Sequence, residues 1–338
     1  MVGPTTTLLM LIVIQQICLV WAGDQGEAVL LGSWLRNDGV EIVYQVPTGG
    51  APRGVVFFAH GCSHSSTDWW PKTKECPTCI GLPVERALVT AALKRGYVAV
   101  AQSSQNRKHR CWSDSDIPHA FATLEWVMSH LKLPVATTPV HLLGASSGGG
   151  FVGRLALKMR AKDKTSPRIL SAIVQISLLR GDNEFALVPQ NDLGILFVHM
   201  SRDVFLAQLI SAYVKDSNRR NIKEMIVLPL ALAPNFFHAH SQHLSLDDSA
   251  KLVAALRDAK FINQDGLLVE DPRQSEWRAV ARKALPHIVP AVDSLEADLS
   301  GISELLNLAW AGHEITDENI VGVFEFMAQR ESAATEIP

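Results

Sequence analysis

The sequence predicts an α/β fold in which a mostly parallel sheet is covered by helices on both faces. Short, continuous apolar runs recur along the chain, as expected for strands that are buried on both sides. Segments with helical spacing separate these runs, and one run ends at a serine flanked by glycines. The chain has 338 residues, 47% of them hydrophobic and 19% charged, so it can bury a full core as one large domain.

The elements alternate from the beginning of the domain. Residues 28–35 and 40–46 read as two strands joined by the turn Asn37-Asp38-Gly39, which predicts an antiparallel hairpin. Further strands are expected at residues 55–59, 97–101, 140–143, 172–176, 194–200 and 225–230. Helices are expected at residues 82–95, 117–131, 151–160 and 204–216. Such alternation places active residues at the carboxyl ends of the strands.

A helical insertion is expected after the last strand, at about residues 248–310. Helical patterns cover residues 248–260 and 276–285, and turn signals break the sequence between them. A final helix begins at Thr316 to Asn319 and runs to about residue 329.

The N-terminus has the character of a signal peptide. An apolar run at residues 8–20 is followed by Val20-Trp21-Ala22, so residues 1–22 are expected to be removed and residues 23–338 to form the domain. The protein would then be secreted or lie in the lumen of the secretory pathway, without stable membrane insertion after cleavage. The segment before the apolar run contains no Lys or Arg, which leaves an uncleaved signal anchor as the alternative.

The cysteines agree with export. Of the five cysteines, Cys18 lies in the predicted signal, which leaves Cys62, Cys76, Cys79 and Cys111 as disulfide candidates. Four cysteines allow three pairings; one of them closes a local loop between Cys76 and Cys79 and joins Cys62 to Cys111. A metal site is not expected, because zinc needs four ligands and no second C-x2-C pair is present.

Composition excludes some partners. A net charge of -3 gives no indication of a nucleic-acid partner. No cofactor motif is present, so no cofactor is expected, and the sequence does not specify an oligomeric state.

The glycine-flanked serine has the pattern of a nucleophile elbow. Gly144 and Gly148 stand two residues before and after Ser146, where a sharp strand-to-helix turn leaves no room for side chains. An apolar strand pattern precedes the motif and a helix pattern follows it, and no G-K-[ST] follows to suggest a phosphate loop. Ser146 is therefore the candidate nucleophile.

These motifs together resemble the α/β-hydrolase fold. The hairpin, the loop His60-Gly61-Cys62, the G-x-S-x-G elbow, a late acid and a later histidine follow the order of that superfamily over nearly all of residues 23–338. More narrowly, the cysteine-containing loops are similar to a poorly characterised group of plant-type predicted α/β hydrolases. The resemblance implies that the backbone N–H groups of Ser147 and Cys62 form an oxyanion hole, with His60 structural behind the loop.

A serine needs a base, and the base needs a carboxylate. Asp203 follows the strand at residues 194–200 directly and is the candidate acid; Asp182 and Asp192 are weaker because neither ends an apolar run. Two histidines fit as the base. His313 precedes the final helix and is preferred, while His243, after the last strand, is the alternative.

The combined prediction is a secreted serine hydrolase that cleaves a small carboxylic ester through an acyl-enzyme. The alternatives are a serine peptidase or amidase of the same fold, since Gly148 and Gly149 also resemble peptidase elbows, and a catalytically silent binding protein. A lipase acting at a membrane surface is disfavoured, because charged residues are scattered through the predicted insertion.

Overall fold

The structure, a computed structural model, describes residues 29–37, 39–160, 167–179, 193–217, 221–241 and 243–335. The predicted signal peptide at residues 1–22 lies outside the described residues, as do Asp38 of the hairpin turn and the two weaker acid candidates, Asp182 and Asp192.

The described residues contain an eight-stranded sheet in the order β1-β2-β4-β3-β5-β6-β7-β8. Its strands are β1 (Ser33–Asn37), β2 (Val40–Gln45), β3 (Gly54–Ala59), β4 (Tyr97–Gln102), β5 (Pro139–Ala145), β6 (Arg168–Gln175), β7 (Gly194–Met200) and β8 (Ile222–Val227). The hairpin of β1 and β2 is antiparallel, and β2 pairs antiparallel with β4; all the other pairs are parallel. This arrangement, with helices on both faces, is the α/β-hydrolase fold.

Helices connect the strands, as the parallel pairing requires. They are α2 (Pro83–Lys94), α3 (Ile117–His130), α4 (Ser147–Arg160), α6 (Val204–Ser217), α7 (Phe236–His240), α8 (Leu246–Asp258), α9 (Trp277–Ala284), α10 (Gly301–Trp310) and α11 (Ile320–Thr335), with short 3-10 helices η1 (Ser66–Asp68) and η2 (Asp114–Asp116).

The sheet separates two apolar cores. Successive residues of a strand point to opposite faces, so Phe58 of β3 belongs to one core and its neighbour Phe57 to the other. The Phe58 face packs against α2 and α11, through residues such as Leu88 and Phe324. The Phe57 face packs against α3, α4 and α6, which are represented by Leu124, Phe151 and Ile210.

Two strands begin earlier than their apolar runs suggested, because polar residues stand at their starts. In β6 the buried Ser171 contacts the Nδ1 atom of His141 at 2.7 Å, so a polar residue is accommodated inside the sheet. In β8, at the sheet edge, Lys223 is exposed and Glu224 contacts the Nε2 atom of His199 at 2.9 Å. The predicted range 225–230 for β8 is therefore displaced by three residues from the observed end at Val227.

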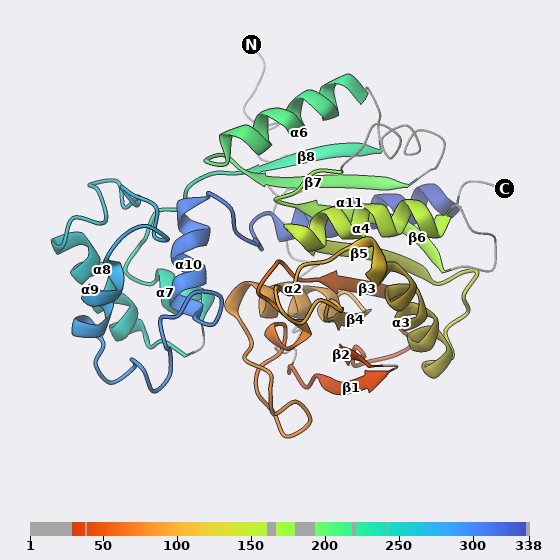
Figure 1. Cartoon of the computed structure of the whole chain (residues 1–338), viewed down its shortest axis with the longest axis horizontal. Helices are drawn as coiled ribbons and strands as arrows, with labels where there is room; N and C mark the ends of the chain where they lie inside the picture. The colour runs from red at the N-terminus through yellow and green to blue at the C-terminus, as the bar shows by residue number, and fades with distance from the viewer. Residues whose placement is uncertain are drawn as a thin grey trace, which may run out of the picture.

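The segment between β8 and α11 contains α7, α8, α9 and α10, which form a group at one side of the sheet (Figure 1). Helices α8 and α9 lie within two residues of the patterns at 248–260 and 276–285, whereas α7 and α10 were not predicted as separate helices. That the range 248–310 is an insertion stays a prediction. Within the described part of the chain, no helix has the length and apolar character needed to cross a membrane.

Candidate active site

Ser146 occupies the sharp turn between β5 and α4, where its backbone has a φ of 52°. Its N–H donates to the carbonyl of Gln175 at 3.0 Å, and its own carbonyl accepts from Gly150 at 3.1 Å. A Cβ atom on Gly144 would lie 2.3 Å from the carbonyl oxygen of Gly148. A Cβ atom on Gly148 would lie 2.3 Å from the carbonyl oxygen of Ala59. Both glycines are thus required by backbone contacts, which explains the spacing of the motif.

The loop after β3 lies beside this elbow, because β3 and β5 are neighbouring parallel strands. Their carboxyl ends therefore open at the same edge of the sheet, where the strand order reverses and where open α/β sheets bind ligands. The N–H groups of Cys62 and Ser147 both belong to this edge. Among the described residues, neither of these N–H groups has a hydrogen-bond acceptor.

His60 orients the loop from behind. Its Nδ1 atom lies 2.6 Å from the carbonyl oxygen of Gly61, and its Nε2 atom accepts from the N–H of Ser104 at 3.1 Å. Nδ1 is therefore the protonated nitrogen, and burial lowers the pKa of His60 to about 4, so the ring is neutral. In a trans peptide the N–H points opposite to the C=O. Since the Gly61 carbonyl faces His60, the N–H of Cys62 points away from that ring.

The structure brings Ser146, His313 and Asp203 together. The Nε2 atom of His313 is 3.1 Å from the Oγ atom of Ser146, and its Nδ1 atom is 2.9 Å from Oδ2 of Asp203. The other carboxylate oxygen of Asp203 accepts from the N–H of Leu206 at 3.3 Å, in the first turn of α6. The nucleophile, base and acid candidates are thus linked in one chain of contacts.

The loops that carry the acid and the base are tied to each other and to the sheet. Next to Asp203, the N–H of Arg202 donates to the carbonyl of Ala311 at 2.9 Å, and its guanidinium lies 3.5 Å from the centre of the Trp310 ring. On the other side of His313, Thr316 exchanges two hydrogen bonds with the side-chain amide of Gln175, at 2.9 and 2.8 Å. Gln175 thereby anchors the histidine loop to β6, next to the elbow.

A cavity of about 200 Å³ opens beside Ser146 and His313. Its wall includes five charged or ionisable side chains that no sequence motif marks: His64, Glu85, Arg273, Asp298 and Glu314. They come from segments that are far apart in the chain, so no spacing pattern could have joined them.

His243, the alternative base, lies elsewhere. It lines a different cavity together with His238, His240 and residues of α2, and no contact joins it to Ser146 among the described residues. Burial and the nearby Arg86 guanidinium lower the pKa of His243. No group of three or more His, Cys, Asp or Glu side chains in the described part of the chain could hold a metal ion.

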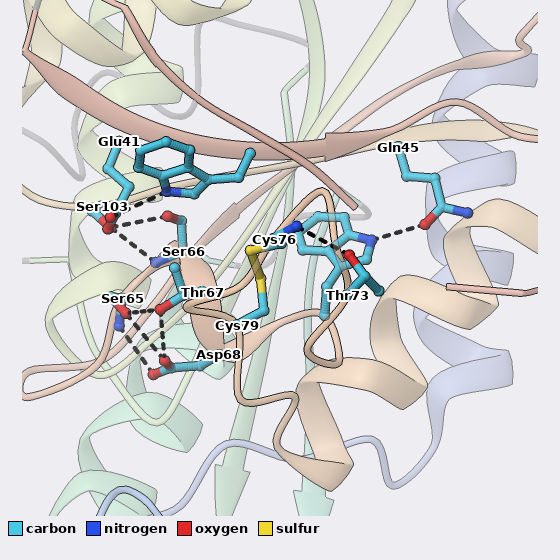
Figure 2. Close-up of a disulfide and its surroundings, with 12 residues drawn as sticks. Glu41, Gln45, Ser65, Ser66, Thr67, Asp68, Thr73, Cys76, Cys79 and Ser103 are labelled. Carbon is cyan, nitrogen blue, oxygen red and sulfur yellow. Dashed lines mark hydrogen bonds between the residues drawn. A yellow bond between two sulfur atoms is a disulfide. The ribbon is translucent and has the colours of Figure 1, made fainter. Parts of the chain in front are cut away.

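Two disulfides flank the site region. Cys62 is bonded to Cys111, which ties the loop after β3 to the segment that precedes α3. Trp112, next in the chain, donates from its indole nitrogen to the His60 carbonyl at 2.9 Å. Cys76 is bonded to Cys79 in a local loop, beside the segment that ends at Asp68 (Figure 2). The pairing is one of the three that the sequence allowed.

We expect the two disulfides to contribute unequally to stability. The Cys62–Cys111 bond spans 49 residues and the Cys76–Cys79 bond only three. A cross-link that closes a longer loop removes more entropy from the unfolded chain. The paired change Cys62→Ser and Cys111→Ser should lower the free energy of unfolding by roughly 3–4 kcal/mol in a urea titration. The matched pair Cys76→Ser and Cys79→Ser should cost clearly less, and equal losses would contradict this account.

The sheet topology and the elbow define this chain as an α/β-hydrolase-fold protein. It matches no protein-family model and no curated protein. Solved structures of similar shape include an alpha-beta serine hydrolase homologue from Coxiella burnetii, with 15% identity, coverage of 64% of this chain and 94% of that one, and a TM-score of 0.42. A monoglyceride lipase variant from Saccharomyces cerevisiae is 12% identical to this chain. The match covers 62% of this chain and 89% of the lipase, with a TM-score of 0.42. A dienelactone hydrolase from Anabaena variabilis is 14% identical to this chain. The match covers 60% of this chain and 87% of that hydrolase, with a TM-score of 0.41. None of these matches supports the narrower plant-type resemblance, which stays a prediction.

Proposed function

We propose that this protein is a serine hydrolase that cleaves a carboxylic ester through an acyl-enzyme. The observation that carries the proposal is the chain of contacts from Ser146 Oγ to His313 Nε2, and from His313 Nδ1 to Asp203. Ser146 is the nucleophile, His313 the general base and Asp203 the carboxylate that fixes the tautomer of the imidazole and stabilises its charge.

In the first half-reaction the Oγ atom of Ser146 attacks the ester carbonyl while His313 Nε2 accepts its proton. The negative charge that develops on the carbonyl oxygen is stabilised by the N–H groups of Ser147 and Cys62. Cleavage of the ester C–O bond releases the alcohol, which takes the proton from His313. Water then attacks the acyl-enzyme by the same route, releasing the carboxylic acid and restoring the hydroxyl of Ser146.

The same groups could also cleave an amide or a peptide, and a silent binding protein could retain them. An ester is the preferred substrate because its alcohol is a better leaving group than the amine of an amide. Cleavage of an ester therefore needs less stabilisation of the transition state by the site. The proposal includes secretion, supported by the signal-like residues 1–22 and by two disulfides, which persist in oxidising compartments. Sequencing of the mature N-terminus tests the cleavage.

A fluorophosphonate probe, which reacts only with an activated serine, tests the assignment. We expect the wild-type protein to be labelled covalently and Ser146→Ala to remain unlabelled, because the nucleophile is absent. Ser332→Ala, at an exposed serine of α11, is the control and should label like wild type. If folded wild-type protein is not labelled, the binding-protein alternative replaces the hydrolase.

A further inference from the structure

The cavity beside Ser146 contains a carboxyl group that the proposed mechanism does not use. Glu85, from α2, lines the cavity although only 2% of its surface is exposed. Behind it lies Glu304 of α10, which is 6% exposed and accepts from the N–H of Val84 at 3.2 Å. Oε2 of Glu85 and Oε1 of Glu304 are both buried, and the two carboxyl groups hydrogen-bond to each other through a shared proton. A carboxyl pair that shares one proton keeps one buried negative charge, so this wall favours a cationic group in the cavity.

A second acidic group lies on the same cavity wall. His64 contacts Asp68 at 2.9 Å through Nδ1 and faces Asp298 at 3.6 Å through Nε2. Figure 2 shows Asp68 itself held by Ser65. Burial opposes protonation of His64, but Asp298 and Asp68 outweigh it and hold the pKa of His64 well above its usual range. One imidazolium therefore faces two carboxylates, and a negative charge remains.

The other cation of the cavity is already paired. Arg273 lies 3.0 Å from Oε2 of Glu314 and also donates to the carbonyl oxygen of His313. Its charge is balanced by Glu314, which accepts in addition from Asn307 at 3.1 Å. Carboxyl groups therefore outnumber cations around the cavity, and the described lining offers no unpaired cation to an anionic substrate.

We propose that this cavity binds the ammonium group of the substrate, with Glu85 as the acceptor that selects it. The inference rests on the proposed ester hydrolysis at Ser146 and names its substrate class, an ester with a protonated amine close to the scissile bond. A cavity of about 200 Å³ is larger than the roughly 150 Å³ that accommodates benzene, so it has room for a short chain with an amine beside the carbonyl. The ammonium brings a positive charge to the wall that contains Glu85, which a neutral substrate of the same shape does not.

The preference should depend on pH. Burial raises the pKa of Glu85 to about 7, and burial together with the Glu85 carboxyl raises that of Glu304 well above its usual range. The groups that face Glu85 are Glu304 from α10, and His64 and Asp68 from the segment after β3. Burial and the Glu85 carboxyl favour the protonated form of Glu304, and Glu85 changes charge near pH 7. The anionic form of Glu85, which attracts ammonium, predominates above this pKa.

The experiment compares isosteric esters at equal concentration of full-length protein, with spontaneous hydrolysis subtracted. On the acyl side, the para-nitrophenyl ester of β-alanine is compared with that of butanoic acid, and the half-ester of malonic acid supplies an anion. On the alcohol side, dimethylaminoethyl acetate is compared with isoamyl acetate. We expect one cationic ester to exceed its neutral isostere in kcat/KM by about 10- to 100-fold, the range of a charge-assisted hydrogen bond. The acyl and alcohol arms distinguish which part of the substrate carries the amine.

The pH dependence of the kcat/KM ratio between the cationic and the neutral ester reports on Glu85, because ionisation of His313 affects both esters alike. The ratio should rise severalfold between about pH 6 and pH 8, as Glu85 loses its proton in the free enzyme. Glu85→Gln should remove this rise and most of the preference, whereas Glu270→Gln, at an exposed carboxylate outside the cavity, should retain both. If Glu85→Gln does not fold, the wild-type pH profile decides alone.

The two proposals can fail separately. If no ester is hydrolysed and Ser146 is not labelled by the fluorophosphonate, the hydrolase assignment fails. If the esters are hydrolysed but the cationic and neutral members of both pairs react equally at every pH, the ammonium site is overturned. Preference for the malonic half-ester would also overturn it and would assign the cavity to Arg273.

Discussion

Replacing His313 by alanine is expected to lower kcat/KM for an ester by about 10⁶-fold, the scale on which a triad histidine acts. Without the imidazole, Ser146 has no base at 3.1 Å to accept its proton, and Asp203 has no ring to orient. His243→Ala should leave the rate within about twofold, because His243 lines a separate cavity.

Steady-state kinetics on the para-nitrophenyl ester of butanoic acid measure both variants. Circular dichroism and thermal unfolding of each variant serve as controls for folding. A large loss in His243→Ala with little change in His313→Ala would reverse the assignment of the base, and equal losses from both substitutions would contradict it.

Replacing Gly148 by alanine is expected to damage the elbow itself. The new methyl group would lie 2.3 Å from the Ala59 carbonyl oxygen and 2.4 Å from that of His60. Both contacts are to backbone atoms, so α4 and the loop after β3 must move apart. We expect a loss of roughly 1–3 kcal/mol in the free energy of unfolding, the usual cost of overpacking. Ester hydrolysis should fall further, because the same movement separates the N–H groups of Ser147 and Cys62.

Gly150→Ala is the matched control, two residues further along the same helix. There the methyl group would meet side-chain atoms of Arg154 and Ser177 at 3.2 Å, and these can move. Alanine also favours a helix over glycine by about 1 kcal/mol. Denaturant unfolding and ester kinetics of the two variants measure the contrast. A Gly148→Ala protein as stable and active as Gly150→Ala would show that the elbow is not constrained as described.

The predicted fold is confirmed because its signals are local. A short continuous apolar run such as β7 favours a strand buried on both faces, and its predicted bounds, 194–200, are those of the structure. Where a polar residue is satisfied inside the sheet, as Ser171 is by His141, the local signal fails and the strand begins earlier than the apolar run. Helix α4 also begins earlier than predicted, at Ser147 and not at residue 151. The glycines in its first turn disfavour a helix in isolation, but close packing requires them there.

The candidate site also has a part that the sequence predicts and a part that depends on tertiary contacts. The sequence alone determined Ser146 and Asp203 as candidates, since each follows a recognisable strand directly and the chain's order carries the information. The chain's order favoured His313, which precedes the final helix, but left His243 as an alternative, because both histidines follow the last strand and precede a helix. In the tertiary structure His313 lies beside Ser146 and Asp203: the Arg202–Ala311 hydrogen bond brings the histidine loop to the candidate acid, and Gln175 holds that loop against the sheet.

The cavity wall was decided by tertiary structure alone. Glu85 and Glu304 are 219 residues apart in sequence, and helix packing brings their carboxyl groups to one wall. No local pattern distinguishes either glutamate from a solvated helix residue, since a charge on a helix is normally exposed. The sequence therefore determined which chemistry the chain could carry, and the three-dimensional packing decided which charges surround it. The physical reason is that strands and turns are encoded by neighbouring residues, whereas a pocket is assembled from loops and helices distant in sequence.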